Sequence, residues 1–285
     1  MARTYNDIYI QARRELKAAG IEAFALEARL IVAQAAGKTM EKLMRDLNLY
    51  ASDGFDRAVR DMVARRVAGE PVAYITGGWE FYGVPLDITQ DVLIPRMDTE
   101  VLVQAAIELF RGRNAKPRIL DLCAGSGCVG CAMGVHMPGA RVVMVDNSQK
   151  ALSVCRKNIV KNKLEVRVMC VEADVTEKPP MLLGKFDLIT CNAPYIPSAE
   201  LVGLDPSVRD YEPVAALDGG EDGLDVIRPV VKHWKSCLKD NGVIMLEIGE
   251  GQAPAVTELL NQAGFRRVGA LQDTGGTDRV IVGLL

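Results

Sequence analysis

The chain has 285 residues, of which 49% are hydrophobic and 25% are charged, and its formal net charge at pH 7 is −3. This composition is typical of a globular protein with room for one large domain and a smaller one, and it excludes a repetitive or low-complexity chain. No run reaches the roughly 18 apolar residues of a membrane span, and the first residues lack a secretory core, so we expect a cytoplasmic protein without membrane contacts.

The first part of the chain has the pattern of a helical domain. Thr4 and Asp7 have the spacing of a capping box, and apolar residues follow at helical intervals from Ile8 to Leu16 before Gly20 ends the run. Further helices are predicted at residues 25–36, 39–45 and 53–68. Together they predict a small helical domain at residues 1–72.

A β-hairpin is predicted to connect this domain to the rest of the chain. Residues 75–88 alternate between apolar and polar and are interrupted by Gly77, Gly78 and Gly83, as in two short strands joined by a turn. We therefore predict a hairpin linker at residues 73–90.

Residues 91–285 alternate between strand and helix patterns. Strands are predicted near residues 118, 141, 166, 185, 242, 265 and 279, and helices near residues 98, 128, 148, 224 and 252. This alternation is typical of an α/β protein with a doubly wound, Rossmann-like sheet and helices on both faces. Ligands of such sheets bind at the carboxyl ends of the strands.

The first of these strands runs into a loop of small residues. Glycine there permits a positive φ and a close approach to a ligand, and the helix that follows offers free N–H groups. The loop residues are Cys123, Ala124, Gly125, Ser126 and Gly127. Taken alone, this loop fits a dinucleotide as well as a nucleoside.

The ends of the next strands decide between those cofactors. Asp146 follows the loop by about 20 residues, where a carboxylate accepts hydrogen bonds from ribose hydroxyls. Asp174 and Val175 follow the third strand, and Asn192 ends the fourth. An acid or amide after each successive strand favours S-adenosylmethionine over NAD.

The fourth strand ends in the tetrapeptide Asn192-Ala193-Pro194-Tyr195. The Asn192 side-chain oxygen and the carbonyl of residue 193 can accept the two hydrogens of a planar –NH2 group. Pro194 has a fixed φ and no N–H, and Tyr195 offers a flat face. The tetrapeptide therefore favours an enzyme that holds an amino group for methylation.

With these motifs the chain resembles the PrmC/HemK family of methyltransferases. The resemblance extends to residues 74–81, 92–100, 211–223, 246–249 and 278–283, and so covers most of the chain from residue 74 onward. It implies methyl transfer from S-adenosylmethionine to the side-chain amide of the glutamine in the Gly-Gly-Gln motif of class 1 peptide-chain release factors, and no metal. It also implies that residues 192–195 are the catalytic and substrate-binding residues, and that the helical domain helps to dock the release factor.

Three residues depart from the family pattern. Ala193 replaces the usual first proline of the tetrapeptide, Cys123 replaces the first glycine of the cofactor loop, and Met97 replaces a proline after Arg96. Alanine keeps the backbone acceptor at position 193, so we expect the chemistry to survive. Cysteine adopts a positive φ less readily than glycine, so Cys123 puts cofactor affinity in doubt.

Two other functions share much of this pattern. An amino-methyltransferase of adenine in DNA or RNA would present a similar –NH2 group, but a nucleic-acid enzyme usually carries a basic surface, and residues 71–285 hold 22 basic against 27 acidic side chains. We therefore expect no stable nucleic-acid binding. A protein that binds S-adenosylmethionine without transferring its methyl group would lack Asn192, which is present.

Several further side chains have a structural interpretation beside a functional one. Cys123, Cys128 and Cys131 have the spacing of iron–sulfur ligands, but they fall on a strand, loop and helix, so we interpret them as core thiols and expect no disulfides. His136 and His233 are interpreted as surface or capping residues. Two groups stay open between a functional role and a local one: Arg96, Thr99 and Glu100 at a helix start, and Arg57, Arg60, Arg65 and Arg66 on one helix.

Overall fold

The computed structural model describes residues 3–112 and 116–285, which divide into two compact units. The smaller unit comprises Met1–Gly78 together with Asp205–Tyr211, and the larger comprises Trp79–Leu204 and Glu212–Leu285. The segment at 205–211 is a feature that sequence patterns did not predict. It returns to the helical unit from far along the chain, where the Tyr211 hydroxyl donates to the Ala68 carbonyl over 3.2 Å.

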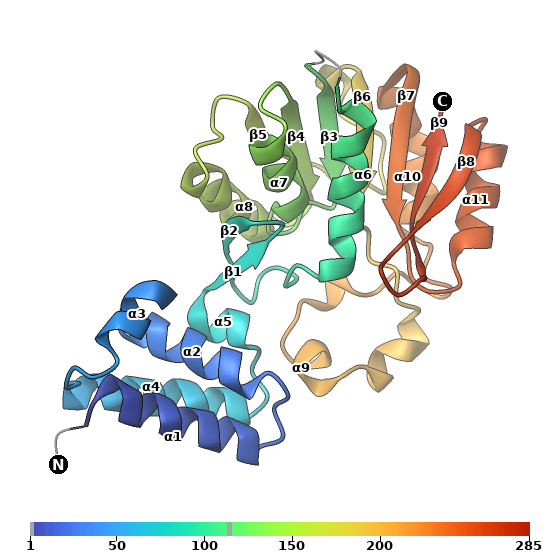
Figure 1. Cartoon of the computed structure of the whole chain (residues 1–285). Helices are drawn as coiled ribbons and strands as arrows, with labels where there is room; N and C mark the ends of the chain where they lie inside the picture. Colours follow the sequence, from blue (N-terminus) through green and yellow to red (C-terminus); the bar gives the residue numbers. More distant parts are fainter. Residues whose placement is uncertain (1–2, 113–115) are drawn as a thin grey trace. The chain divides into compact units, whose positions relative to one another are not determined.

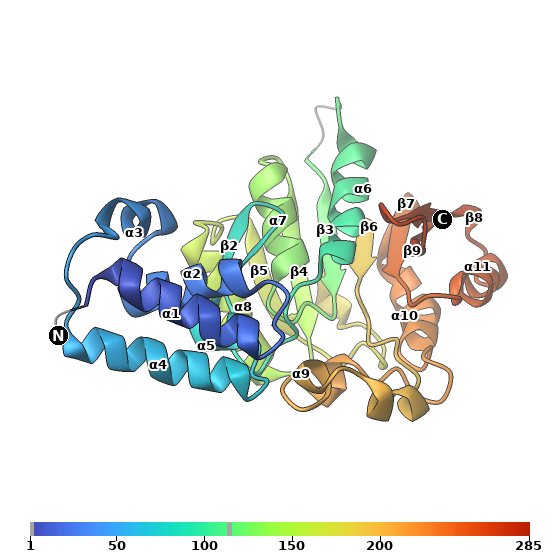
Figure 2. The ribbon, with the colours of Figure 1, turned by 60° about the horizontal axis from the view of Figure 1, so that its bottom comes forward.

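The smaller unit is a cluster of helices. Its elements are α1 (Tyr5–Ala18), α2 (Phe24–Ala35), α3 (Met40–Asp46), α4 (Asp53–Val67), α5 (Val72–Thr76) and α9 (Pro206–Arg209). The predicted capping box starts α1: Thr4 Oγ1 accepts from the Asp7 N–H over 3.1 Å, and Asp7 Oδ2 accepts from the Thr4 N–H over 2.8 Å. The apolar stripe from Ile8 to Leu16 is buried, and α1 packs on α2 and α4 (Figure 2).

The arginines of α4 divide into two kinds. Arg66 Nε donates to the buried Glu27 of α2 over 2.6 Å, and Arg65 donates twice to Glu70, which is also buried. The first pair joins α4 to α2 and the second joins α4 to the segment that follows it, so both arginines have a structural role. Arg57 and Arg60 are exposed, and Arg60 pairs with Asp56 one turn earlier on the same helix.

The connection between the two units differs from the predicted hairpin at its start. Helix α5 occupies residues that the alternating pattern assigned to the first strand, because Pro71 stands at its N-cap and Gly77, at φ +70°, ends it in the left-handed region. The hairpin itself is short, with strands β1 (Gly78–Phe81) and β2 (Val84–Asp87) joined through Tyr82 and Gly83.

The larger unit contains the predicted doubly wound sheet (Figure 1). Its strands are β3 (Arg118–Leu122), β4 (Arg141–Asp146), β5 (Val168–Glu172), β6 (Phe186–Cys191), β7 (Leu238–Glu247), β8 (Arg266–Gln272) and β9 (Asp278–Leu284). They lie in the order β5-β4-β3-β6-β7-β9-β8. The first five in this order are parallel, whereas β9 is antiparallel to both β7 and β8.

Helices cover both faces of this sheet, as the alternating pattern predicted. On one face α6 (Glu100–Phe110), α7 (Cys128–His136) and α8 (Gln149–Lys161) pack side by side. On the other, α10 (Ile227–His233) and α11 (Ala253–Gln262) cover a buried cluster that includes Leu120, Ile189 and Trp234. The two layers bury the central strands β3 and β6, whose sequences are apolar along most of their length, whereas the edge strand β8 is mostly exposed.

Local boundaries differ from the predicted positions where turns intervene. Strand β5 begins at Val168 instead of 166, because Lys163 takes φ +58° and Val166 lies 95% exposed in the turn. The helix predicted near 98 starts as a 3₁₀ turn, η1 (Met97–Thr99), and the one predicted near 224 begins at Ile227. Among the described residues, no helix is long and apolar enough to cross a membrane.

Candidate active site

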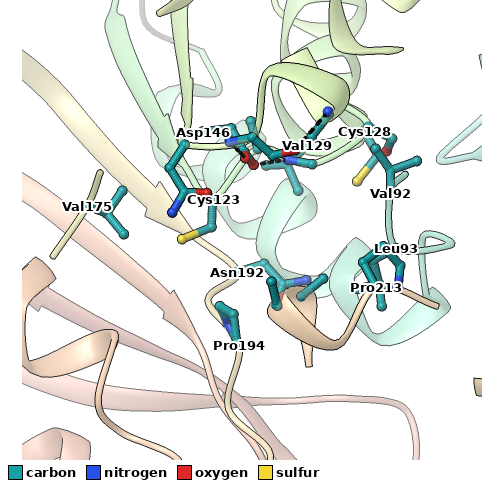
Figure 3. A pocket seen from close by; sticks show the side chains of 18 of the residues that line it. Val92, Leu93, Cys123, Cys128, Val129, Asp146, Val175, Asn192, Pro194 and Pro213 are labelled. Atoms are coloured by element: carbon teal, nitrogen blue, oxygen red, sulfur yellow. Dashed lines mark hydrogen bonds between the residues drawn. The ribbon is translucent and has the colours of Figure 1, made fainter. Parts of the chain in front are cut away.

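A pocket opens at the carboxyl ends of β3, β4 and β6, at the point between β3 and β6 where the strand order reverses. Ligands of doubly wound sheets bind at this position. Nine of the twelve residues assigned from the sequence to the cofactor or substrate site line the pocket, several of them shown in Figure 3. They are Cys123, Ala124, Gly125, Ser126, Asp146, Asp174, Val175, Asn192 and Pro194.

The cofactor loop has the conformation that its glycines predict. Gly125 has φ +53°, and Gly127, at φ +79°, is the N-cap of α7. A Cβ on Gly127 would stand 2.7 Å from Cys155 Sγ, so position 127 excludes a side chain for steric as well as conformational reasons. Cys123 also has a positive φ, +56°, which costs a non-glycine residue on the order of 1 kcal/mol.

The Asp146 carboxylate is held in place by the loop that it faces. Its Oδ2 accepts from the Gly125 N–H over 2.8 Å, and its Oδ1 accepts from the Ser148 N–H over 2.9 Å. Each oxygen keeps a second lone pair for another donor. The carboxylate therefore lies beside the loop with acceptor capacity left, and its role toward ribose hydroxyls stays a prediction.

Asp121, on β3, is a pocket residue that the sequence patterns did not single out. Its Oδ1 accepts from the Thr190 hydroxyl over 2.8 Å, whereas its Oδ2 is buried and has no hydrogen-bond partner among the described residues. Burial raises the pKa of Asp121 to about 7 and the charge of Asp146 adds to the rise, against the opposing effects of the Thr190 hydroxyl and the nearby Gly130 backbone N–H. When ionised, this carboxyl adds negative potential beside the pocket, which favours a cationic group, and the amino and sulfonium groups of S-adenosylmethionine are cationic.

Asn192 lies at the end of β6 and is linked to a second buried acid. Its Nδ2 donates to Thr99 Oγ1 over 3.2 Å, and the Thr99 hydroxyl donates to Glu247 Oε1 over 3.1 Å. Burial raises the pKa of Glu247 to about 7, Asp98 adds to the rise, and the Thr99 and Asn192 hydrogen bonds and Arg279 oppose it. Glu247 belongs to the motif at 246–249, whose role the sequence left open.

Of the three residues considered at the start of α6, only Thr99 lines the pocket. Arg96 instead forms an ion pair with the buried Glu212, whose other oxygen accepts from the Ile94 N–H over 3.1 Å. Glu100 accepts from the Tyr82 N–H over 3.0 Å, which joins α6 to the hairpin. Arg96 and Glu100 therefore have structural contacts of their own.

The backbone of Tyr195 packs closely against two glycines, Gly219 and Gly223. Gln252 Nε2 donates to the Tyr195 carbonyl over 2.9 Å, and a Cβ on Gly223 would collide with that same carbonyl. A Cβ on Gly219 would come within 2.8 Å of Tyr195 Cα. The glycines of the motif at 211–223 are thus required by close backbone approach, and their spacing is the signal that could have linked this motif to the tetrapeptide.

Three of the predicted site residues do not line the pocket. Gly127 is the N-cap of α7, and Ala193 is 2% exposed within the hydrophobic core. The Tyr195 ring is half-buried, and burial raises the pKa of its hydroxyl to about 12. The roles of the Ala193 carbonyl and the Tyr195 face stay predictions.

The cysteine and histidine side chains of the described residues do not form a metal site. Across residues 3–112 and 116–285 no group of three or more His, Cys, Asp or Glu side chains could hold a metal ion, and all seven cysteines are free. Burial raises the pKa of the Cys128 thiol to about 12 and that of Cys131 as well, which disfavours the thiolate form that ligates metals. His136 and His233 lie at the last turns of α7 and α10.

Comparison with known proteins agrees with this geometry. Residues 7–77 match the model of the PrmC N-terminal domain, and residues 86–202 match the methyltransferase small domain. The release factor glutamine methyltransferase of Geobacter sulfurreducens is 39% identical over 264 residues, which cover 93% of this chain and 90% of that protein. The chain belongs to the release factor glutamine methyltransferase family. The relative of the same name from Agrobacterium fabrum is 35% identical and covers 95% of this chain and 94% of its own length.

Solved structures support the fold of this family member. The human METTL16 catalytic domain, crystallised with an RNA hairpin, has a TM-score of 0.58 at 16% identity and covers 78% of this chain and 81% of its own. A methyltransferase from Pyrococcus furiosus has a TM-score of 0.52 at 14% identity, covering 80% and 98%. At these identities the likeness shows the fold alone. Family and fold together make the chain a methyltransferase whose cofactor is S-adenosylmethionine.

Proposed function

We propose that the protein transfers a methyl group from S-adenosylmethionine to the side-chain amide nitrogen of the glutamine in the Gly-Gly-Gln motif of class 1 peptide-chain release factors. The observation that carries the proposal is the shared pocket: the Asn192 amide and Pro194 line the same cavity as Asp146 and the cofactor loop. The family of the chain supplies the substrate class, and a cytoplasmic location follows from that substrate.

The cofactor loop, Asp146 and Asp121 would bind the cofactor. The bound S-adenosylmethionine supplies an electrophilic methyl group on its sulfonium. Asp146 would accept from the ribose hydroxyls, and the negative charge of the Asp121 carboxylate beside the pocket would favour a cationic group. Asp174 and Val175 line the same pocket beyond the end of β5 and would contact the adenine end.

The tetrapeptide would position the nucleophile. A carboxamide nitrogen is a poor nucleophile because its lone pair is delocalised, so the enzyme must align it with the methyl carbon. Asn192 Oδ1 and the Ala193 carbonyl would accept its two hydrogens, and such orientation can be equivalent to effective molarities of about 10⁵ M or more. The new N–C bond forms as the S–C bond breaks.

The proton released by the alkylated nitrogen needs no strong base. That nitrogen becomes acidic once it carries the methyl group, so its proton can leave to water or to a carbonyl oxygen. Tyr195 cannot act as the base near neutral pH, because burial raises its pKa to about 12 and keeps the hydroxyl protonated. Positioning, rather than proton abstraction, would therefore provide most of the rate enhancement.

The helical unit would help to dock the release factor. The residues of α4 proposed to contact the partner are the exposed Arg57 and Arg60, since Arg65 and Arg66 pair with the buried acids Glu70 and Glu27. In this proposal residues 1–72 recognise the protein substrate, residues 73–90 connect, and residues 91–285 perform the transfer.

One experiment tests the proposal against adenine methylation. The protein is incubated with S-adenosylmethionine carrying a labelled methyl group and a purified class 1 release factor, with duplex DNA and ribosomal RNA in parallel, and the label is mapped by peptide mass. We expect label on the Gly-Gly-Gln glutamine, lost in Asn192→Ala. Label on nucleic acid alone would overturn the proposal.

A further inference from the structure

A chain of hydrogen bonds runs from the Asn192 amide into the protein interior. It consists of the two bonds described above, from Asn192 Nδ2 to Thr99 Oγ1 and from the Thr99 hydroxyl to Glu247 Oε1. Thr99 and Glu247 are only 1% and 2% exposed. The three residues come from η1 and from the ends of β6 and β7, so three separate elements converge on one amide.

The chemistry of these groups fixes which group donates and which accepts in each of the two hydrogen bonds. An ionised carboxylate can only accept hydrogen bonds, and a threonine hydroxyl has a single hydrogen to donate. Because Thr99 gives that hydrogen to Glu247, it can only accept from Asn192. Nδ2 is the donor of the Asn192 amide, so Nδ2 must face Thr99 and Oδ1 must face away from it.

We propose that Thr99 and Glu247 are positioning residues that orient the Asn192 amide so that Oδ1, and not Nδ2, is presented to the substrate –NH2 group. The inference rests on the proposed function, because it requires that Asn192 Oδ1 accept a hydrogen from the glutamine amide. It assigns a role to Glu247, a buried acid that the transfer step does not otherwise use.

The two orientations of an asparagine amide have nearly the same shape, so packing alone distinguishes them poorly. In the inverted orientation an N–H of Asn192 would oppose an N–H of the glutamine, and the substrate amide would lose its acceptor. Without the chain of hydrogen bonds both orientations are populated, and only one is productive. The inverted orientation would instead favour a ligand that presents an acceptor, such as the carboxylate of a glutamate.

Thr99→Val tests the inference, with Thr99→Ser as the matched control that keeps the hydroxyl. Methyl transfer to a release factor is measured at pH 8.5, above the pKa of about 7 for Glu247, and cofactor affinity is measured by calorimetry. We expect Thr99→Val to lower kcat by about 10- to 100-fold, because misplacing a reacting group has costs of this order. We expect the Kd for S-adenosylmethionine to change less than about threefold, and Thr99→Ser to restore kcat to within about threefold of wild type.

A second readout reports the amide orientation itself. The Kd values of a Gly-Gly-Gln peptide and a matched Gly-Gly-Glu peptide are compared in each variant. The wild type should prefer the glutamine peptide, and Thr99→Val should reduce that preference about fivefold or more, which a general loss of packing would not do. Glu247→Leu, which removes the acceptor at the inner end, should reduce the preference likewise if circular dichroism shows it to be folded.

The outcomes separate this inference from the proposed function. Full activity of Asn192→Ala would refute the assignment of Asn192, and with it the proposed transfer site. If Asn192→Ala is inactive while Thr99→Val keeps both wild-type kcat and wild-type peptide preference, the assignment of Asn192 is retained. The proposal that Thr99 and Glu247 orient its amide is then refuted. Equal losses in Thr99→Val and Thr99→Ser would also overturn it, since the hydroxyl would then not be the group that matters.

Discussion

The buried carboxyl of Asp121 predicts a specific pH dependence of stability. Burial raises its pKa from 3.8 to about 7 in the folded protein. Between these values the folded protein holds a proton that the unfolded chain has released, so the free energy of unfolding falls as the pH rises through this window. At about 1.36 kcal/mol for each pKa unit, the loss accumulates to about 4 kcal/mol by pH 7 to 8.

Asp121→Asn removes this titration while keeping an oxygen that can accept from Thr190. The difference in unfolding free energy between the variant and wild type should therefore shift by about 4 kcal/mol in favour of the variant between pH 4 and pH 8. This shift does not depend on any pH-independent effect of the substitution on stability. Urea unfolding at fixed ionic strength measures the difference. Asp240→Asn, at an exposed position of β7, is the matched control for the change of side chain. Parallel curves for wild type and Asp121→Asn would show that Asp121 is not held in its protonated form by burial.

Three further variants test separate parts of the site. Asp146→Ala should weaken binding of S-adenosylmethionine by about 1.5–3 kcal/mol, since ribose hydroxyls lose a charged acceptor, and calorimetry that finds unchanged affinity in a folded variant would contradict this role. Gly127→Ala should lower the free energy of unfolding by about 1–3 kcal/mol, because residue 127 has a positive φ and the added methyl would collide with Cys155 Sγ. Gly276→Ala is the control, because residue 276 also has a positive φ but has open space around it, so this variant shows the cost of backbone strain without a collision. Arg57→Glu combined with Arg60→Glu should raise KM for an intact release factor but not for a short Gly-Gly-Gln peptide, and equal effects on both substrates would argue against docking by α4.

The order and type of most elements followed from local physics. Alternating strand and helix patterns predict a doubly wound sheet, because each element must bury one apolar face against the next layer. The capping box at Thr4 is a contact between near neighbours in the chain, so its spacing alone predicted it. The position of residues 123–126 and Asp146 at the pocket was likewise predictable, since each group stands directly after a strand whose carboxyl end faces that edge of the sheet.

Tertiary structure decided the contacts between residues far apart in the chain. Glu247, Thr99 and Asn192 are separated by up to 148 positions, and only the pairing of β6 with β7 and the packing of η1 bring their side chains within hydrogen-bond distance. The same holds for the glycines that enclose Tyr195 and for the return of residues 205–211 to the helical unit. A sequence pattern records which face of an element is apolar. It does not record which polar group from a distant element will meet a given side chain, nor how burial will then shift its pKa, as at Asp121 and Glu247.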